Sequence, residues 1–204
     1  EGDIGLAAVA RNYAALFATP RGRWTYGYIL LNGMFHSGIF SWLGAYFHDR
    51  YHLGDIGIGL ALLGYGVPGM LLGPLIGRAA DRLGRRRIIP AGLAIGALAA
   101  AGLGTPLPLA LAVCVVTILS LGFDMSHPLL AGIVTTLDPQ RRGQAMGMNA
   151  FVLFMGFGLG SLVFQAAMHL PGELPAAMWA FGATEALAAA VALHAFRNEQ
   201  RRGE

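Results

Sequence analysis

Charged side chains are scarce in this sequence. Only 12% of its 204 residues are charged, whereas 55% are hydrophobic, and the mean hydropathy is +0.57. Soluble domains carry roughly a quarter charged residues, so the composition excludes an ordinary soluble domain. The apolar residues fall in blocks of about twenty, the length that a helix needs to cross a bilayer. The sequence therefore predicts an all-α integral membrane protein.

Three further absences narrow the class of protein. The single cysteine, Cys114, lies in an apolar block, which excludes an intrachain disulfide. The first 25 residues contain no uninterrupted apolar core before Arg21 and Arg23, which argues against a cleavable signal peptide. No basic residue lies inside an apolar block, so the pI of 9.4 does not indicate nucleic-acid binding.

The apolar blocks predict six transmembrane helices joined by short connections. Their approximate ranges are 24–47, 56–76, 88–103, 106–130, 144–168 and 175–196. Before them lies an apolar and basic leader, residues 1–23, which we expect to form an interfacial helix, with a disordered linker as the alternative. After them comes a short tail, residues 197–204.

Arginine is distributed unevenly over the predicted loops. With six spans, both termini and the loops after the second and fourth spans share one side, and only Arg50 lies on the other. The shared side holds thirteen arginines: Arg11, Arg21, Arg23, Arg78, Arg82, Arg85, Arg86, Arg87, Arg141, Arg142, Arg197, Arg201 and Arg202. Short loops rich in arginine stay in the cytoplasm, so both termini are expected there.

Glycine spacing predicts close contacts between the helices. The chain has 30 glycines, and several of them recur at intervals of four residues. These are Gly69, Gly73 and Gly77, Gly92 with Gly96, Gly143 with Gly147, and Gly156 with Gly160. In lipid, such small residues let two backbones approach each other.

The most distinctive motif lies between the second and third predicted spans. Residues 77–87 read Gly-Arg-Ala-Ala-Asp-Arg-Leu-Gly-Arg-Arg-Arg and hold five of the 14 cationic residues. A Gly-x-x-x-Asp-Arg-x-Gly-Arg-Arg loop between two apolar spans resembles the signature loop of the major facilitator superfamily of transporters. The resemblance implies a six-helix bundle that is one half of a twelve-helix fold, with this loop in the cytoplasm.

The resemblance also implies a conformational latch in this loop. The latch residues would be Gly77, Asp81, Arg82, Gly84, Arg85 and Arg86. Asp81 would be the anion, the arginines its partners, and the two glycines would permit the backbone geometry. The alternative is that the arginines only fix the topology by attracting anionic lipid, with roughly 1 kcal/mol from each.

Two features resemble the C-terminal half of such a transporter rather than the N-terminal half. The leader is similar to the end of the loop that joins the halves. The fifth span, residues 144–168, contains glycines but no proline, unlike the Gly-Pro kink motif of many N-terminal halves. An N-terminal six-helix half, on the same chain or another, is then an expected partner.

Ionisable residues at bilayer depth cost at least roughly 2.5 kcal/mol each, so each requires a reason. Asp124 and His127 are three apart, and Asn32 and His36 are four apart, so each pair shares a helix face. We predict that these four line the substrate cavity, with Asp124 and His127 as a proton-responsive pair. The alternative is that Asp124 braces a proline kink. Glu185 is expected to serve in structural pairing or a subunit contact.

The leading interpretation is a secondary transporter of the bacterial inner membrane, without a cofactor and not an enzyme. It would move a small molecule, a drug or metabolite, outward in exchange for protons. One alternative is a half-size membrane subunit that pairs with another chain or with itself. Another is an intramembrane serine peptidase of the rhomboid type, although Ser37 and Ser161 lack the Gly-x-Ser-Gly pattern.

Cysteine labelling in intact cells tests the predicted orientation. A single cysteine beside Arg85 or Arg141, in a chain without Cys114, should react with a membrane-impermeant maleimide only after the cells are opened. A cysteine beside Arg50 should react in intact cells, because that loop lies on the opposite side. Labelling beside Arg85 or Arg141 from outside would contradict the topology.

Overall fold

The computed structural model describes residues 5–199, which form helices and short connections without a β-strand. The helices are α1 (Leu6–Leu16), α2 (Pro20–Phe40), α3 (Leu43–Tyr51), α4 (Asp55–Leu62), α5 (Val67–Leu83), α6 (Arg85–Leu103), α7 (Leu109–Val134), α8 (Arg142–Ala167) and α9 (Glu173–Ala195). The predicted all-α class is therefore confirmed for this part of the chain.

Five helical segments among the described residues are long and apolar enough to cross a membrane. They are the combined segment Asp55–Leu83, which contains α4 and α5, and the helices α6, α7, α8 and α9. α2 has 21 residues but does not belong to this set, because polar residues such as Asn32 and His36 dilute its apolar character. The predicted number of spans was six, so the first predicted span is the exception.

The first two predicted spans are each interrupted. The first breaks at Ser41 between α2 and α3, and the second breaks between α4 and α5. In the second break Gly66 has a φ of 84°, a left-handed conformation that favours glycine. Pro68 then lies in the first turn of α5, where its missing N–H removes no helical hydrogen bond. Pro74 lies inside α5.

The chain enters the bundle earlier than the sequence predicted. α2 begins at Pro20 rather than near residue 24, because the Thr19 hydroxyl caps the helix and accepts a 3.1 Å hydrogen bond from the Gly22 N–H. The leader contains α1, which the Asn12 side chain ties to Arg141 through a hydrogen bond. The first four residues of the leader and residues 200–204 of the tail lie outside the described residues.

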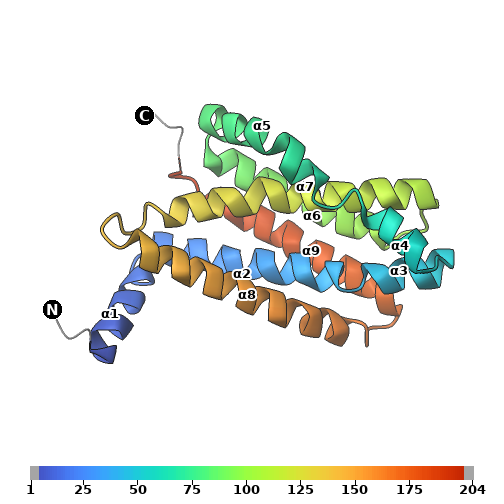
Figure 1. Cartoon of the computed structure of the whole chain (residues 1–204), viewed down its shortest axis with the longest axis horizontal. Coiled ribbons are helices and arrows are strands. Elements are labelled where there is room, and N and C mark those ends of the chain that lie inside the picture. Colours follow the sequence, from blue (N-terminus) through green and yellow to red (C-terminus); the bar gives the residue numbers. More distant parts are fainter. Residues whose placement is uncertain (1–4, 200–204) are drawn as a thin grey trace.

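The helices run side by side along the long axis of the molecule (Figure 1). α2 packs along α8, and α6 packs between α7 and α9. The α5–α6 turn, the α7–α8 loop, α1 and the end of α9 lie at one end of the bundle, whereas α3, α4 and the α8–α9 loop lie at the other (Figure 1). The arginine-rich connections therefore gather at one end, which we call the basic end.

Glycine brings α2 and α8 into backbone contact. A methyl group added at Gly156 would lie 2.6 Å from the carbonyl oxygen of Leu30, and one added at Gly160 would lie 2.3 Å from that of Met34. In the same way, a methyl group on Gly92 of α6 would lie 2.8 Å from the carbonyl oxygen of Gly122 in α7. These distances are too short for any side chain, so the glycines set how closely the helices pack.

The predicted glycine contacts are only partly confirmed. Gly156 and Gly160 touch α2, and Gly92 and Gly96 lie against neighbouring side chains or backbone. An added methyl group would meet nothing within 4 Å at Gly73, Gly77, Gly143 or Gly147. Regular spacing along a helix identifies glycines on one face, but it does not say whether another helix covers that face.

Replacing Gly160 with alanine tests the backbone contact. Gly160→Ala should destabilise the purified protein by about 1–3 kcal/mol, because the methyl group must push α2 away from α8. Gly158→Ala on the same helix is the matched control, since nothing lies within 4 Å of the added methyl group. Thermal unfolding in detergent measures both. Equal melting temperatures for the two variants would contradict the contact.

Candidate functional site

The interruption between α4 and α5 carries polar groups to two other helices. The Tyr65 hydroxyl lies 2.9 Å from Nδ1 of His36 in α2. The next residue, Gly66, donates its backbone N–H to the Ser120 hydroxyl of α7 at 2.9 Å. A helix end leaves backbone donors without helical partners, and here one of them is satisfied by a side chain of a neighbouring helix. The break thus joins α2, α5 and α7 through hydrogen bonds.

Aromatic rings surround the His36 side chain. Its ring centroid lies 4.0 Å from that of Phe123, 5.3 Å from that of Tyr65, 5.7 Å from that of Phe157 and 6.1 Å from that of Phe40. These rings come from α2, the α4–α5 break, α7 and α8. The half-buried histidine is therefore held by ring packing and has one hydrogen-bond partner, Tyr65, among the described residues.

Asp124 lies against α5. The Ser120 hydroxyl, one helical turn earlier in α7, donates a 3.2 Å hydrogen bond to its Oδ2. A methyl group added at Gly69 of α5 would lie 2.7 Å from its Oδ1. Because Ser120 also accepts the Gly66 N–H, the carboxylate is linked through one hydroxyl to the α4–α5 break.

The predicted pair of Asp124 and His127 is not formed as a direct contact. Within residues 5–199 no hydrogen bond or salt bridge joins them, and His127 Nδ1 is buried without a partner. The His127 ring instead stacks on Phe123, with centroids 5.1 Å apart and planes 10° apart. Three residues turn a helix by about 300°, which leaves two side chains roughly 60° apart and free to face different neighbours.

Asn32 and His36 lie on one face of α2, as their spacing suggested, and both contact α7. The Asn32 amide donates a 2.8 Å hydrogen bond to the Ser126 hydroxyl, and both side chains are buried. Ser126 in turn donates to the Gly122 carbonyl at 2.9 Å. Sequence reasoning missed Ser126 and Ser120. The signal for Ser120 was its position four residues before Asp124, on the same helix face.

The signature loop forms a turn of one residue. α5 ends at Leu83, α6 begins at Arg85, and Gly84 between them has a φ of 84°. The predicted turn at Gly84 is therefore confirmed, with the conformation that only glycine adopts readily. Gly77 has open space around it, so it is not required for a close contact within this chain.

Within residues 5–199 the structure contains no salt bridge between Asp81 and the arginines of this loop. The salt bridges within residues 5–199 are those of Arg21 with Glu199 and of Arg141 with Asp138, and neither involves Asp81. Asp81 lies exposed in the last turn of α5, whereas the arginines after Gly84 begin α6. Arg85 turns instead toward α7, where its guanidinium would lie 3.2 Å from a methyl group on Gly132.

Arg21 makes the most extensive polar contact at the basic end. Its guanidinium forms a salt bridge with Glu199 and donates a 2.9 Å hydrogen bond to the Thr136 hydroxyl. This contact joins the first turn of α2, the end of α7 and the segment after α9. This contact could not be predicted from the sequence, because the three residues are far apart along the chain.

The serine residues considered for a peptidase have no nucleophilic arrangement. The Ser37 hydroxyl donates a 2.8 Å hydrogen bond to the Phe157 carbonyl. Neither Ser37 nor Ser161 contacts a histidine through a hydrogen bond within the described residues. A serine nucleophile needs a base within hydrogen-bond reach, so the geometry does not favour this alternative.

A bundle of long apolar helices with polar groups at bilayer depth defines an integral membrane protein. A family model described as Major Facilitator Superfamily matches residues 25–204. The chain therefore belongs to this superfamily, and its general function is membrane transport of small molecules. A search of the curated proteins found no match. Members of the superfamily are transporters rather than enzymes, which agrees with the expectation from the sequence.

Removing the Ser126 hydroxyl tests the buried bond to Asn32. Ser126→Ala should destabilise the protein by about 1 kcal/mol, because the Asn32 amide loses its acceptor. The double variant Asn32→Leu with Ser126→Ala should recover part of this loss, since no polar group is then left unpaired. Thermal unfolding in detergent measures both. Asn32→Leu is also measured alone. If the double variant loses as much stability as Ser126→Ala and Asn32→Leu lose together when measured singly, the bond is contradicted.

Proposed function

We propose that this chain is the C-terminal half of a proton-coupled transporter that exports a drug or metabolite. In this proposal both termini are cytoplasmic and the protein lies in the bacterial inner membrane. The grouping of the arginine-rich connections at one end of the bundle supports this orientation (Figure 1), because short arginine-rich loops stay on the cytoplasmic side.

The observation that carries the proposal is the set of polar contacts centred on His36 and Asp124. Polar groups in a membrane helix are costly and usually mark a substrate or proton pathway. Here they lie on α2 and α7 and meet the interrupted segment between α4 and α5. Interrupted helices are a common place for substrate and ion sites in transporters.

In the proposed mechanism His36 and Asp124 exchange protons and contact the substrate. Tyr65 bonds His36, and Ser120 links Asp124 to Gly66, so both groups are coupled to the same helix break. A change of protonation at either residue would change a hydrogen bond that holds the break. The α4–α5 segment would then shift and favour one side of the membrane over the other.

The proposed partner is an N-terminal six-helix half, on the same chain or another. α5 and α8 present large exposed apolar side chains, among them Met70 (75% exposed) and Phe154 (67% exposed). The two helices border the polar contacts around His36 and Asp124, so a partner half packed on them would enclose these contacts. A half-size subunit that pairs with a separate chain or with itself has the same geometric requirement.

The latch that we propose differs from the one predicted within the loop, because the partner of Asp81 lies on the other half. Since Asp81 has no salt-bridge partner within residues 5–199, its partner would have to come from the other half. Asp81 lies at the basic end, exposed on α5, where the partner half would pack. A negative side chain at this position would interact favourably with an arginine or a helix N-terminus of the partner half.

Transport by the Asp124→Asn variant tests the proposed site. In proteoliposomes that contain the complete transporter, a pH gradient should drive uptake or release of ethidium by the wild-type protein. Asp124→Asn should reduce this flux to that of protein-free vesicles, because the amide cannot exchange a proton. Asp49→Asn, an exposed change in α3, is the control and should transport normally. Normal pH-driven flux in Asp124→Asn would overturn the site assignment.

A further inference from the structure

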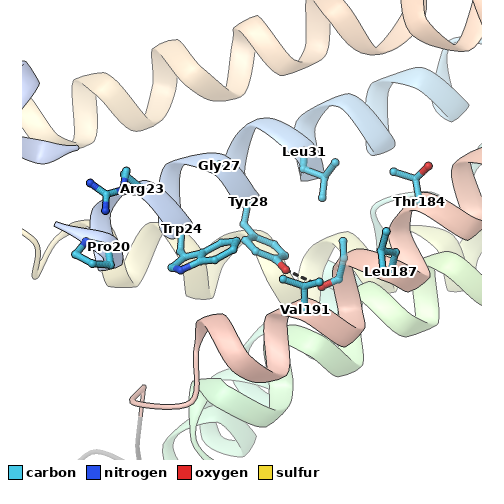
Figure 2. Close-up of a pocket in the computed structure, with 10 residues that line it drawn as sticks. Pro20, Arg23, Trp24, Gly27, Tyr28, Leu31, Thr184, Leu187 and Val191 are labelled. Atoms are coloured by element: carbon cyan, nitrogen blue, oxygen red, sulfur yellow. Dashed lines mark hydrogen bonds between the residues drawn. The ribbon is translucent and has the colours of Figure 1, made fainter. Parts of the chain in front are cut away.

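A groove of about 670 Å³ runs between α2 and α9, away from the polar contacts described above (Figure 2). Its lining is almost entirely apolar, and it begins at Pro20, Arg23 and Trp24 at the basic end and extends inward to Leu31 and Thr184. The residues of α2 that border it extend from Pro20 to Leu31, a length of about 16 Å at 1.5 Å per residue. Asn32 and His36 belong to the face of α2 that meets α7, so this groove is separate from the proposed transport site.

A smaller cavity of about 70 Å³ adjoins the inner end of the groove. The two share Leu31 and Thr184, and the cavity is otherwise lined by α2, α8 and α9. Glu185 of α9 lines it and is only 1% exposed. Its Oε2 is buried without a hydrogen-bond partner in the described residues. The cavity beside the inner end of the apolar groove thus holds a carboxylate oxygen that no group of the described residues satisfies.

The two neighbouring hydroxyls donate their hydrogen bonds to backbone carbonyls rather than to this carboxylate. The Tyr28 hydroxyl, which also lines the groove, donates to the Ala188 carbonyl at 2.7 Å (Figure 2). The Thr184 hydroxyl donates to the Ala180 carbonyl at 2.8 Å. The structural pairing predicted for Glu185 from the sequence is therefore absent among the described residues. A buried carboxylate without a partner is costly, which calls for a ligand.

We infer that the groove and the cavity form a binding site for a lipophilic amine. The ammonium group occupies the cavity and donates hydrogen bonds to Glu185, while the apolar body fills the groove between α2 and α9. Bonds between opposite charges are strong in a site that excludes water. Exposed side chains such as Leu187 line the groove, so the ligand reaches it from the lipid.

The position of the carboxylate favours an amine over a lipid acyl chain. An acyl chain could fill the apolar groove, but it would leave Oε2 of Glu185 without a partner. Water in the cavity could satisfy the carboxylate, yet it would leave the groove outside it without a specific occupant. A molecule with a cationic end and an apolar body complements both parts at once.

Quenching of Trp24 fluorescence by a brominated amine tests this inference. The complete protein is reconstituted with every tryptophan except Trp24 replaced by phenylalanine, including Trp42 and Trp179, so that Trp24 at the mouth of the groove is the reporter. The probe is ω-bromododecylamine, whose amine would reach Glu185 and place the bromine near Trp24. ω-Bromododecanol, which lacks the charge, measures quenching by partition into the lipid alone.

The amine should quench Trp24 saturably and at lower membrane concentrations than the alcohol. Glu185→Gln should weaken the apparent affinity for the amine by about tenfold, as expected for the loss of a charge-assisted hydrogen bond, and leave quenching by the alcohol unchanged. Equal quenching by amine and alcohol, or an unchanged affinity in Glu185→Gln, would overturn the proposal.

A second variant keeps the test valid if Glu185→Gln does not fold. Gly27 lines the groove, and a methyl group added there meets nothing within 4 Å, so the side chain of Gly27→Leu starts in open space and extends into the groove. This variant should obstruct the groove and weaken saturable quenching by the amine at least tenfold. Wild-type binding by Gly27→Leu would overturn the site. Transport of ethidium is measured separately, so failure here does not bear on the proposed transport function.

Discussion

Backbone contact between helices is the constraint on which the rest of this structure depends. In lipid there is no hydrophobic drive between helices, so they associate through close packing and interhelical hydrogen bonds. Gly156 and Gly160 let α8 lie directly on the carbonyl groups of α2. Gly92 and Gly122 do the same for α6 and α7. These contacts fix α2 and α7 in the bundle, and both helices carry the polar groups of the candidate site.

The polar groups follow from this packing and from one helix interruption. α2 brings Asn32 and His36 to α7, while the α4–α5 break brings Tyr65 and Gly66 to the same region. A continuous helix would satisfy the Gly66 N–H within its own backbone. The interruption frees that donor for Ser120, so the backbone and the side chains share one set of hydrogen bonds. This arrangement couples the site to the interrupted segment between α4 and α5.

Several features could be predicted because they depend on local physical chemistry. The apolar blocks identified the helices, and the Gly84 turn followed from a conformation that glycine adopts most readily. The spacing of Asn32 and His36 placed them on one face, which meets α7. The same reasoning failed for Asp124 and His127, because it fixes an angle on a helix but not the neighbour that each side chain meets. It also did not indicate the neighbours of Asp81, because two of its three predicted partners, Arg85 and Arg86, begin the next helix.

By itself the sequence determined a membrane protein with apolar helices, an arginine-rich end and a family-specific loop. These properties depend on residue type and on spacing within one helix, which the chain carries in linear order. Only the tertiary structure decided that Ser126 faces Asn32, that Arg21 reaches Glu199, and that Glu185 lies unpaired behind an apolar groove. Each of these depends on the rotation and depth of one helix against another, which packing sets after the helices have formed.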